Sequence, residues 1–283
     1  MPVVNVIILA IVQGFAELLP VSSSAHVVVA EKLMGLDPSS PPMTLLLVML
    51  HTGTMFAVIV FFWRRWRDSY FRSAETFKAT AGRVILATVL TAVVGEIIIK
   101  IIEKTAFRDV PHAQIEDLFS HLEFIAPALA AAGLLILVAG IIQKRRSARA
   151  LTETNDMTMQ QAGVIGTVQG LCLPFRGFSR SGATISAGTL MGIAKARAED
   201  FSFALAVVLT PPVVIREVMR LMQAEHANGG GAALGSVALL SLLGALVAFV
   251  AGLLALKWLS RWLETGRWYL FGIYCLAAAA AVT

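Results

Sequence analysis

Apolar residues run almost unbroken through six stretches of this chain. A bilayer core of ~30 Å takes about 20 helical residues, and apolar runs of that length predict transmembrane helices. The stretches lie near residues 44–63, 83–102, 124–143, 201–222, 234–257 and 267–283. We therefore expect an all-α polytopic membrane protein.

Two further apolar stretches are interrupted. The first has arms at 3–19 and 24–35, the second has arms at 160–173 and 183–195, and each breaks at proline with serine or glycine. Neither arm alone has the length of a typical transmembrane helix. Each pair therefore predicts a re-entrant helical hairpin that enters and leaves on one face of the membrane. A break at that depth is tolerated only where protein or a water-filled cavity surrounds the backbone.

The two interrupted stretches are similar in sequence. Residues 11–35 read IVQGFAELLPVSSSAHVVVAEKLMG, and residues 167–192 read TVQGLCLPFRGFSRSGATISAGTLMG. Each half of the chain, 1–143 and 144–283, then holds one re-entrant hairpin and three spans. Because three is an odd number of crossings, the second half enters the membrane from the opposite face. We therefore expect two inverted-topology repeats within a single integral membrane domain, 1–283. Broken helices at matching positions of two halves point to a binding site.

Composition and charge agree with this topology. The chain is 57% hydrophobic and 14% charged, whereas soluble domains carry about 25% charged residues. Lysine and arginine gather in the loops 64–83, 144–159 and 257–267, while 103–123 and 223–233 are poor in them. The positive-inside rule places the basic loops in the cytoplasm and both termini outside. The net charge of +5 therefore does not indicate nucleic-acid binding.

The tip of the first hairpin concentrates polar groups. Glu17 lies well inside the first arm, and Gln13 precedes it by one helical turn. Ser22 and Ser23 suit the start of the next arm as helix caps, and His26 falls in its first turn. An ionisable side chain at such depth is a functional hypothesis by default.

The tip of the second hairpin is complementary. Arg180 supplies a fixed cation with fork geometry, and Ser179, Ser181 and Thr184 supply hydroxyls at a predicted helix start. A helix N-terminus with an arginine and hydroxyls forms an anion site, most naturally for phosphate.

Structural alternatives stay open for these residues. The serines can be ordinary helix caps, Arg180 can snorkel to the interface, and Glu17 with Arg180 can form a purely structural pair. His51, within the first span, either lines the cavity or is a hydrogen-bonded structural histidine, and the sequence favours neither.

Three motifs carry a resemblance to a known family: QGFAELLPVSSSAH at 13–26, FFWRR at 61–65 and GFSRSGATISAGTLMG at 177–192. The chain resembles the undecaprenyl-diphosphatase family, also called the bacitracin-resistance protein family, over essentially its whole length. The resemblance implies an enzyme that removes the terminal phosphate of a C55 isoprenyl diphosphate, with Mg²⁺ or Ca²⁺, and so recycles the carrier for peptidoglycan synthesis. It also implies the bacterial inner membrane and an active site that faces the periplasm.

The resemblance assigns roles by position. The first family motif has two glutamates four apart, and Gln13 stands here in place of the first. The implied catalytic residues are Glu17, Ser23, His26 and Arg180. The implied substrate ligands are Gln13, Ser22, Ser179, Ser181 and Thr184, and the implied metal ligands are Glu17 and Gln13.

Two questions remain open from sequence. The nucleophile can be His26, Ser23, Ser22 or water. A prenyl-phosphate transporter or flippase with little or no hydrolysis is the alternative function, because inverted repeats with broken helices also build alternating-access carriers. A homodimer is compatible with either function.

Overall fold

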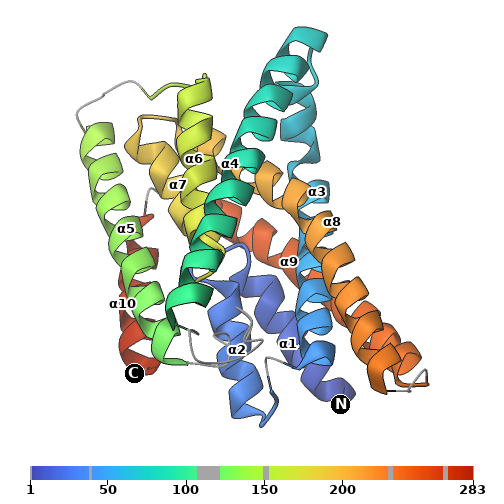
Figure 1. The fold of residues 1–283 in the computed structure, drawn as a ribbon. Coiled ribbons are helices and arrows are strands. Elements are labelled where there is room, and N and C mark those ends of the chain that lie inside the picture. Colours follow the sequence, from blue (N-terminus) through green and yellow to red (C-terminus); the bar gives the residue numbers. More distant parts are fainter. Residues whose placement is uncertain are drawn as a thin grey trace.

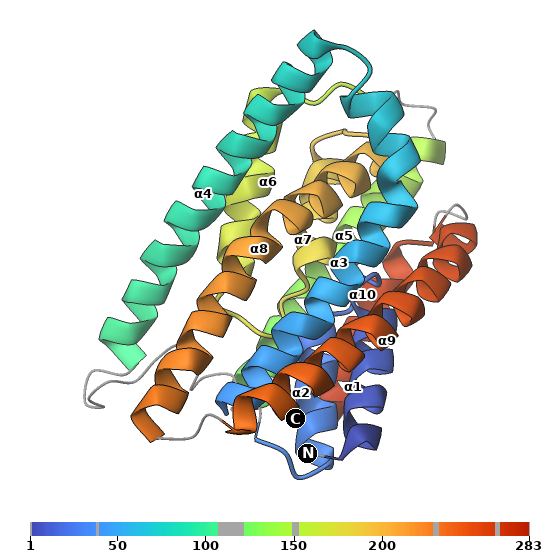
Figure 2. The ribbon, with the colours of Figure 1, turned by 90° about the vertical axis from the view of Figure 1, so that its right-hand side faces the viewer.

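The computed structural model describes residues 2–37, 40–106, 122–148, 153–228, 232–263 and 267–282. These residues form ten helices, drawn in Figures 1 and 2, and an isolated bridge between Thr154 and Ile193. The helices are α1 (Val3–Ala16), α2 (Ser23–Leu33), α3 (Pro41–Tyr70), α4 (Ala74–Ala106), α5 (Leu122–Ala148), α6 (Met159–Cys172), α7 (Arg180–Leu190), α8 (Lys195–Asn228), α9 (Ala232–Leu263) and α10 (Tyr269–Val282). The predicted all-α class is confirmed.

Five of the six predicted spans form helices long and apolar enough to cross a membrane, counted over the described ranges. They are α3, α4, α5, α8 and α9, so this is a multi-pass membrane protein. The prediction of a sixth full span at 267–283 is wrong: α10 has 14 residues, which rise only ~21 Å. The stretch opens on the charged Arg267, which leaves fewer apolar residues than a crossing takes. Residues 107–121, most of the predicted loop 103–123, lie outside the described residues.

Both interrupted stretches form pairs of short helices, α1 with α2 and α6 with α7. The first arm ends at Ala16, before Pro20, because a proline disfavours helical geometry at the residue preceding it. As predicted, Ser22 caps α2 by accepting from the Ala25 N–H at 3.4 Å, and Ser179 caps α7 by accepting from the Gly182 N–H at 3.2 Å. In Figure 1 the pairs enter from opposite ends, and their tips meet halfway.

The connections sort to the two ends of the molecule. The α3–α4 corner and the α5–α6 connection lie at one end, and the two termini lie toward the other (Figure 1). The predicted basic loops 64–83 and 144–159 therefore share one end.

The repeated Val-Gln-Gly motif marks where each hairpin packs against a long helix. α1 packs on α9, and α6 packs on α4. A Cβ atom on Gly14 would lie 2.5 Å from the Cβ of Ala251, and one on Gly170 would lie 2.8 Å from the carbonyl oxygen of Thr91. Small residues let helices approach closely in a membrane, so glycine is required at both motif positions.

Gly14→Ala should therefore destabilise the protein by about 1–3 kcal/mol, because overpacking forces α1 away from α9. Gly82 in α4 is the matched control, since a Cβ there meets no atom within 4 Å. Gly82→Ala should stabilise by about 0.5–1 kcal/mol through helix propensity. Thermal unfolding in detergent should show shifts of opposite sign; equal shifts would contradict the packing explanation.

Candidate active site

The two hairpin tips bring Glu17 and Arg180 into contact. Glu17 lies at the C-terminal end of α1, and Arg180 is the first residue of α7. The Nη2 of Arg180 donates to the Oε1 of Glu17 at 2.9 Å, and the Arg180 and Glu17 side chains are 23% and 12% exposed. The juxtaposition expected from the repeated stretches is therefore present.

Three further groups surround the second oxygen of the Glu17 carboxylate. The Nε2 of Gln13 donates to Oε2 at 2.8 Å, and the hydroxyl of Ser23 donates to it at 2.5 Å. The Nε2 of His51, from α3, lies 3.3 Å from the same oxygen. This cluster joins both arms of the first hairpin, the second hairpin and the first long span.

His51 contacts Glu17 and also forms a hydrogen bond within its own helix, so the structure is compatible with both interpretations from the sequence. Its Nδ1 lies 2.8 Å from the Leu47 carbonyl oxygen, while its Nε2 faces the Glu17 carboxylate. The Leu47 carbonyl oxygen only accepts hydrogen bonds, so Nδ1 of His51 carries a hydrogen in this contact.

The site favours an anionic ligand. Arg180 supplies a guanidinium cation beside the single carboxylate, Glu17, and the Nε2 of His51 faces the same carboxylate. The N-termini of α2 and α7 lie at the same two tips, and unpaired N–H groups at helix starts attract anions, phosphate above all. A phosphate group would therefore find both charge and hydrogen-bond donors here.

Backbone geometry at the first tip is unusual. Ser22 has φ 66, in the left-handed region, and no other non-glycine residue in the described ranges has a positive φ. Such conformations persist only where the surroundings enforce them, and they cluster at functional sites. The turn aligns the start of α2, and with it Ser23, toward Glu17.

His26 contacts a residue that the sequence did not single out. Its Nδ1 lies 2.8 Å from the Ser22 carbonyl oxygen, so this nitrogen carries the hydrogen. Its Nε2 lies 2.7 Å from the hydroxyl of Tyr274, and the two rings stack with centroids 5.7 Å apart. Tyr274 sits in the apolar run of α10 without a motif around it, which is why sequence reasoning missed it.

The hydroxyls predicted at the second tip lie within α7 and its cap. The Ser179 hydroxyl accepts from the Gly182 N–H, and Ser181 is buried. The Thr184 hydroxyl donates to the Arg180 carbonyl oxygen at 2.8 Å and lies 2.6 Å from the hydroxyl of Ser202. These side chains support the turn that presents Arg180, and none of them contacts Glu17.

The side-chain oxygens of Glu17 and Gln13 suit a divalent cation that has further ligands from outside the protein. Among the described residues, no group of three or more His, Cys, Asp or Glu side chains could hold a metal ion. Oε1 of Glu17 has one donor, Arg180, and retains a lone pair, and Oε1 of Gln13 is buried without a hydrogen-bond partner. Mg²⁺ is often held by one or two protein oxygens together with substrate phosphates and water.

Comparisons with known proteins agree with this geometry. The sequence model of a family described as "Bacitracin resistance protein BacA" matches residues 6–281. The chain belongs to the BacA family. It is 55% identical to Undecaprenyl-diphosphatase 2 of Acinetobacter baylyi, over 100% of this chain and 97% of that protein. It is also 32% identical to Undecaprenyl-diphosphatase 2 of Burkholderia thailandensis, over 96% of this chain and 92% of the relative.

Gln13 contributes an amide donor to the site. Its Nε2 donates to Glu17 at 2.8 Å, which a carboxylate could not do. A glutamate at position 13 would place a second negative charge against Glu17, and two such carboxylates need a proton or a cation between them. Gln13 therefore contacts Glu17 without adding charge.

Proposed function

We propose that this protein hydrolyses undecaprenyl diphosphate to undecaprenyl phosphate and inorganic phosphate at the Glu17–Arg180 site. The observation that carries the proposal is the 2.9 Å contact between these residues at the meeting point of two helix N-termini. Family membership and the names of the relatives support the same substrate. The reaction returns the lipid carrier to peptidoglycan synthesis and confers bacitracin resistance.

Arg180 binds the terminal phosphate in this proposal, together with the N–H groups that open α2 and α7. Phosphoryl transfer depends on positioning and on neutralising the charge of the equatorial oxygens. A guanidinium fork suits both tasks. The prenyl tail remains among the apolar helix faces.

Ser23 is the proposed nucleophile, because its hydroxyl already donates to Glu17 at 2.5 Å. Its oxygen attacks the terminal phosphorus, its proton passes to Glu17, and the bridging P–O bond breaks to release undecaprenyl phosphate. Water then attacks the phosphoserine, Ser23 recovers a proton from Glu17, and inorganic phosphate leaves. His26 reaches the substrate only after exchanging its contact with Tyr274.

The proposed setting is the bacterial inner membrane, with both termini and the opening of the site toward the periplasm. The basic loops 64–83 and 144–159 support a cytoplasmic position for the end that they share. The reciprocal packing of α1 on α9 and of α6 on α4 supports two inverted repeats.

A divalent cation, Mg²⁺ or Ca²⁺, is the proposed cofactor, with Glu17 and Gln13 as protein ligands. It would supply positive charge beside the phosphate oxygens. Gln13→Glu should strengthen this site, because a second carboxylate raises the charge that faces the ion. The metal concentration for half-maximal activity should fall about tenfold, which corresponds to ~1.4 kcal/mol.

Isothermal titration of Mg²⁺ into the substrate-free protein provides a readout besides activity. Gln13→Asn is the control, since it keeps the neutral amide and shortens the reach. Equal Mg²⁺ affinity in Gln13→Glu and the parent protein would refute the assignment of position 13.

The competing function is a prenyl-phosphate carrier without hydrolysis, which the entry of the two hairpins from opposite ends favours. Purified protein with farnesyl diphosphate and Mg²⁺ separates the two functions. The phosphatase should release inorganic phosphate, and EDTA should abolish the release. Saturable binding of farnesyl phosphate without phosphate release would instead establish the carrier.

A further inference from the structure

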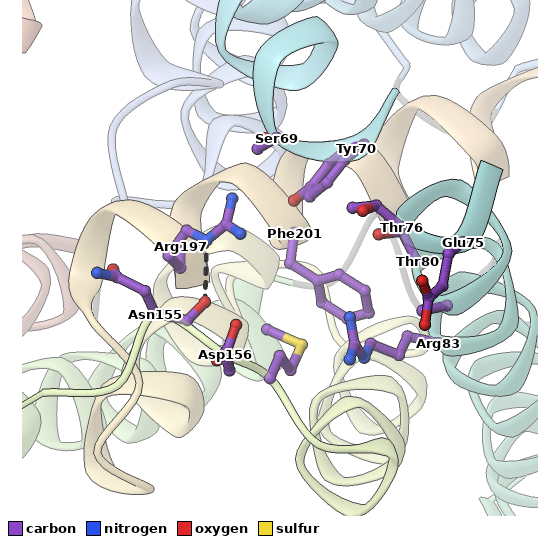
Figure 3. Close-up of a pocket in the computed structure, with 12 residues that line it drawn as sticks. Ser69, Tyr70, Glu75, Thr76, Thr80, Arg83, Asn155, Asp156, Arg197 and Phe201 are labelled. Carbon is purple, nitrogen blue, oxygen red and sulfur yellow. Dashed lines mark hydrogen bonds between the residues drawn. The ribbon is translucent and has the colours of Figure 1, made fainter. Parts of the chain in front are cut away.

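A second site lies at the α3–α4 corner, at the end of the molecule away from the termini (Figure 2). A cavity of about 270 Å³ opens there between the end of α3, the first turns of α4, the segment before α6 and the start of α8. Figure 3 shows Tyr70, Arg83, Asp156 and Arg197 gathered around Phe201. None of these residues contributes to the Glu17–Arg180 site.

The cavity holds charges of both signs that do not neutralise one another. Arg83 and Arg197 are the cations, and Glu75 and Asp156 are the carboxylates. In the part of the chain that the structure describes, no ion pair joins either carboxylate to either guanidinium. Both carboxylates are exposed and both guanidiniums are half-buried, so the guanidiniums gain most from a partner of opposite sign.

The two guanidiniums retain donors for a ligand. The Nε of Arg197 donates to the Asn155 carbonyl oxygen at 3.0 Å, drawn dashed in Figure 3, and its guanidinium carbon lies 5.9 Å from the centroid of the Tyr70 ring. The Nε of Arg83 is buried without a hydrogen-bond partner. An unsatisfied buried donor costs about 1–3 kcal/mol, which a bound acceptor recovers.

Neighbouring side chains place this cavity at the level of lipid headgroups. Trp63, Phe71 and Phe77 are each about half exposed; the Trp63 and Phe71 rings are tilted with centroids 6.0 Å apart, and the Phe71 and Phe77 rings stack at 5.5 Å. Aromatic rings concentrate where the bilayer core meets water. Ile85, 63% exposed, begins the apolar face of α4 just beyond Arg83.

We propose that this cavity binds the headgroup of a zwitterionic phospholipid that carries a phosphate and a primary ammonium group. The phosphate lies between Arg83 and Arg197, and the ammonium lies against Glu75 and Asp156. A headgroup with a phosphate but no amine would leave both carboxylates facing its negative charge, so the cavity discriminates against it.

Native mass spectrometry of the full-length protein in detergent tests this site. Three probes are titrated: dihexanoyl phosphatidylethanolamine, dihexanoyl phosphatidylglycerol and soluble glycerophosphoethanolamine. One phosphatidylethanolamine should bind at least about tenfold more tightly than phosphatidylglycerol. Equal binding of the two lipids would overturn the proposal. If glycerophosphoethanolamine and phosphatidylethanolamine bind equally tightly, the proposal of a lipid ligand is overturned. The ligand would then be a soluble compound with a phosphate and an amine.

Charge-changing variants locate the binding within the cavity. Arg83→Gln should weaken phosphatidylethanolamine binding at least about tenfold, and unchanged affinity would overturn the proposal. Glu75→Gln alters an exposed residue, so folding is preserved, and it should raise phosphatidylglycerol binding relative to phosphatidylethanolamine. An unchanged ratio would count against the ammonium contact. Arg72→Gln, at the same corner but outside the cavity, is the matched control.

Discussion

Arg180→Ala should lower the rate of phosphate release from farnesyl diphosphate by about 10³-fold, because arginines that stabilise phosphoryl-transfer transition states contribute 10³–10⁵ in rate. The variant loses the cation that contacts Glu17 at 2.9 Å and that would neutralise the transferred phosphate. The measurement is inorganic phosphate released by purified protein in detergent with Mg²⁺. The rate of Arg180→Lys should lie between the rates of the parent protein and Arg180→Ala, because lysine keeps the positive charge and loses the fork geometry of the guanidinium.

The control for Arg180 is Arg64→Ala. Arg64 is exposed near the end of α3 and lies outside the site, so its variant should keep parent activity. Near-normal turnover in Arg180→Ala would remove Arg180 from the reaction and leave it as the partner of Glu17 in a structural ion pair.

Glu17→Gln should reduce phosphate release by about 10³-fold, because a positioned general base contributes 10²–10⁴ in rate. The amide is nearly the same size as the carboxylate, but it cannot take the Ser23 proton or balance the charge of Arg180. Activity and thermal unfolding are to be measured on the same preparation. A structural role predicts lost stability with retained turnover, whereas a catalytic role predicts lost turnover.

Glu96→Gln is the matched control for Glu17. Glu96 forms an exposed pair with Lys100 at 3.2 Å, and exposed pairs contribute only about 0–1 kcal/mol. This variant should leave both activity and unfolding temperature close to those of the parent protein. Loss of stability without loss of turnover in Glu17→Gln would identify the Glu17–Arg180 contact as structural.

Local sequence patterns predicted much of the fold and half of the contacts at the site. Proline with serine or glycine marked both helix breaks, because their backbone preferences act within a few residues. The relation between the two stretches then predicted that Glu17 and Arg180 meet, although 163 positions separate them. Gln13 was placed correctly because its neighbour lies four residues away on the same helix face.

Contacts that depend on helix rotation could not be predicted in the same way. His51 reaches Glu17 only because α3 turns that face toward the first tip, and Tyr274 reaches His26 from the far end of the chain. An apolar span in a membrane has no polar side to fix its rotation from sequence alone. The Thr184–Ser202 contact between α7 and α8 was missed for the same reason.

The close helix contacts at Gly14 and Gly170 make the two halves of the chain depend on each other. The first hairpin rests on α9, which the second half supplies, and the second hairpin rests on α4, which the first half supplies. Neither half alone contains the surface that seats its own broken helix. A fragment ending before α6 would therefore expose the face of α1 that Gly14 packs against Ala251.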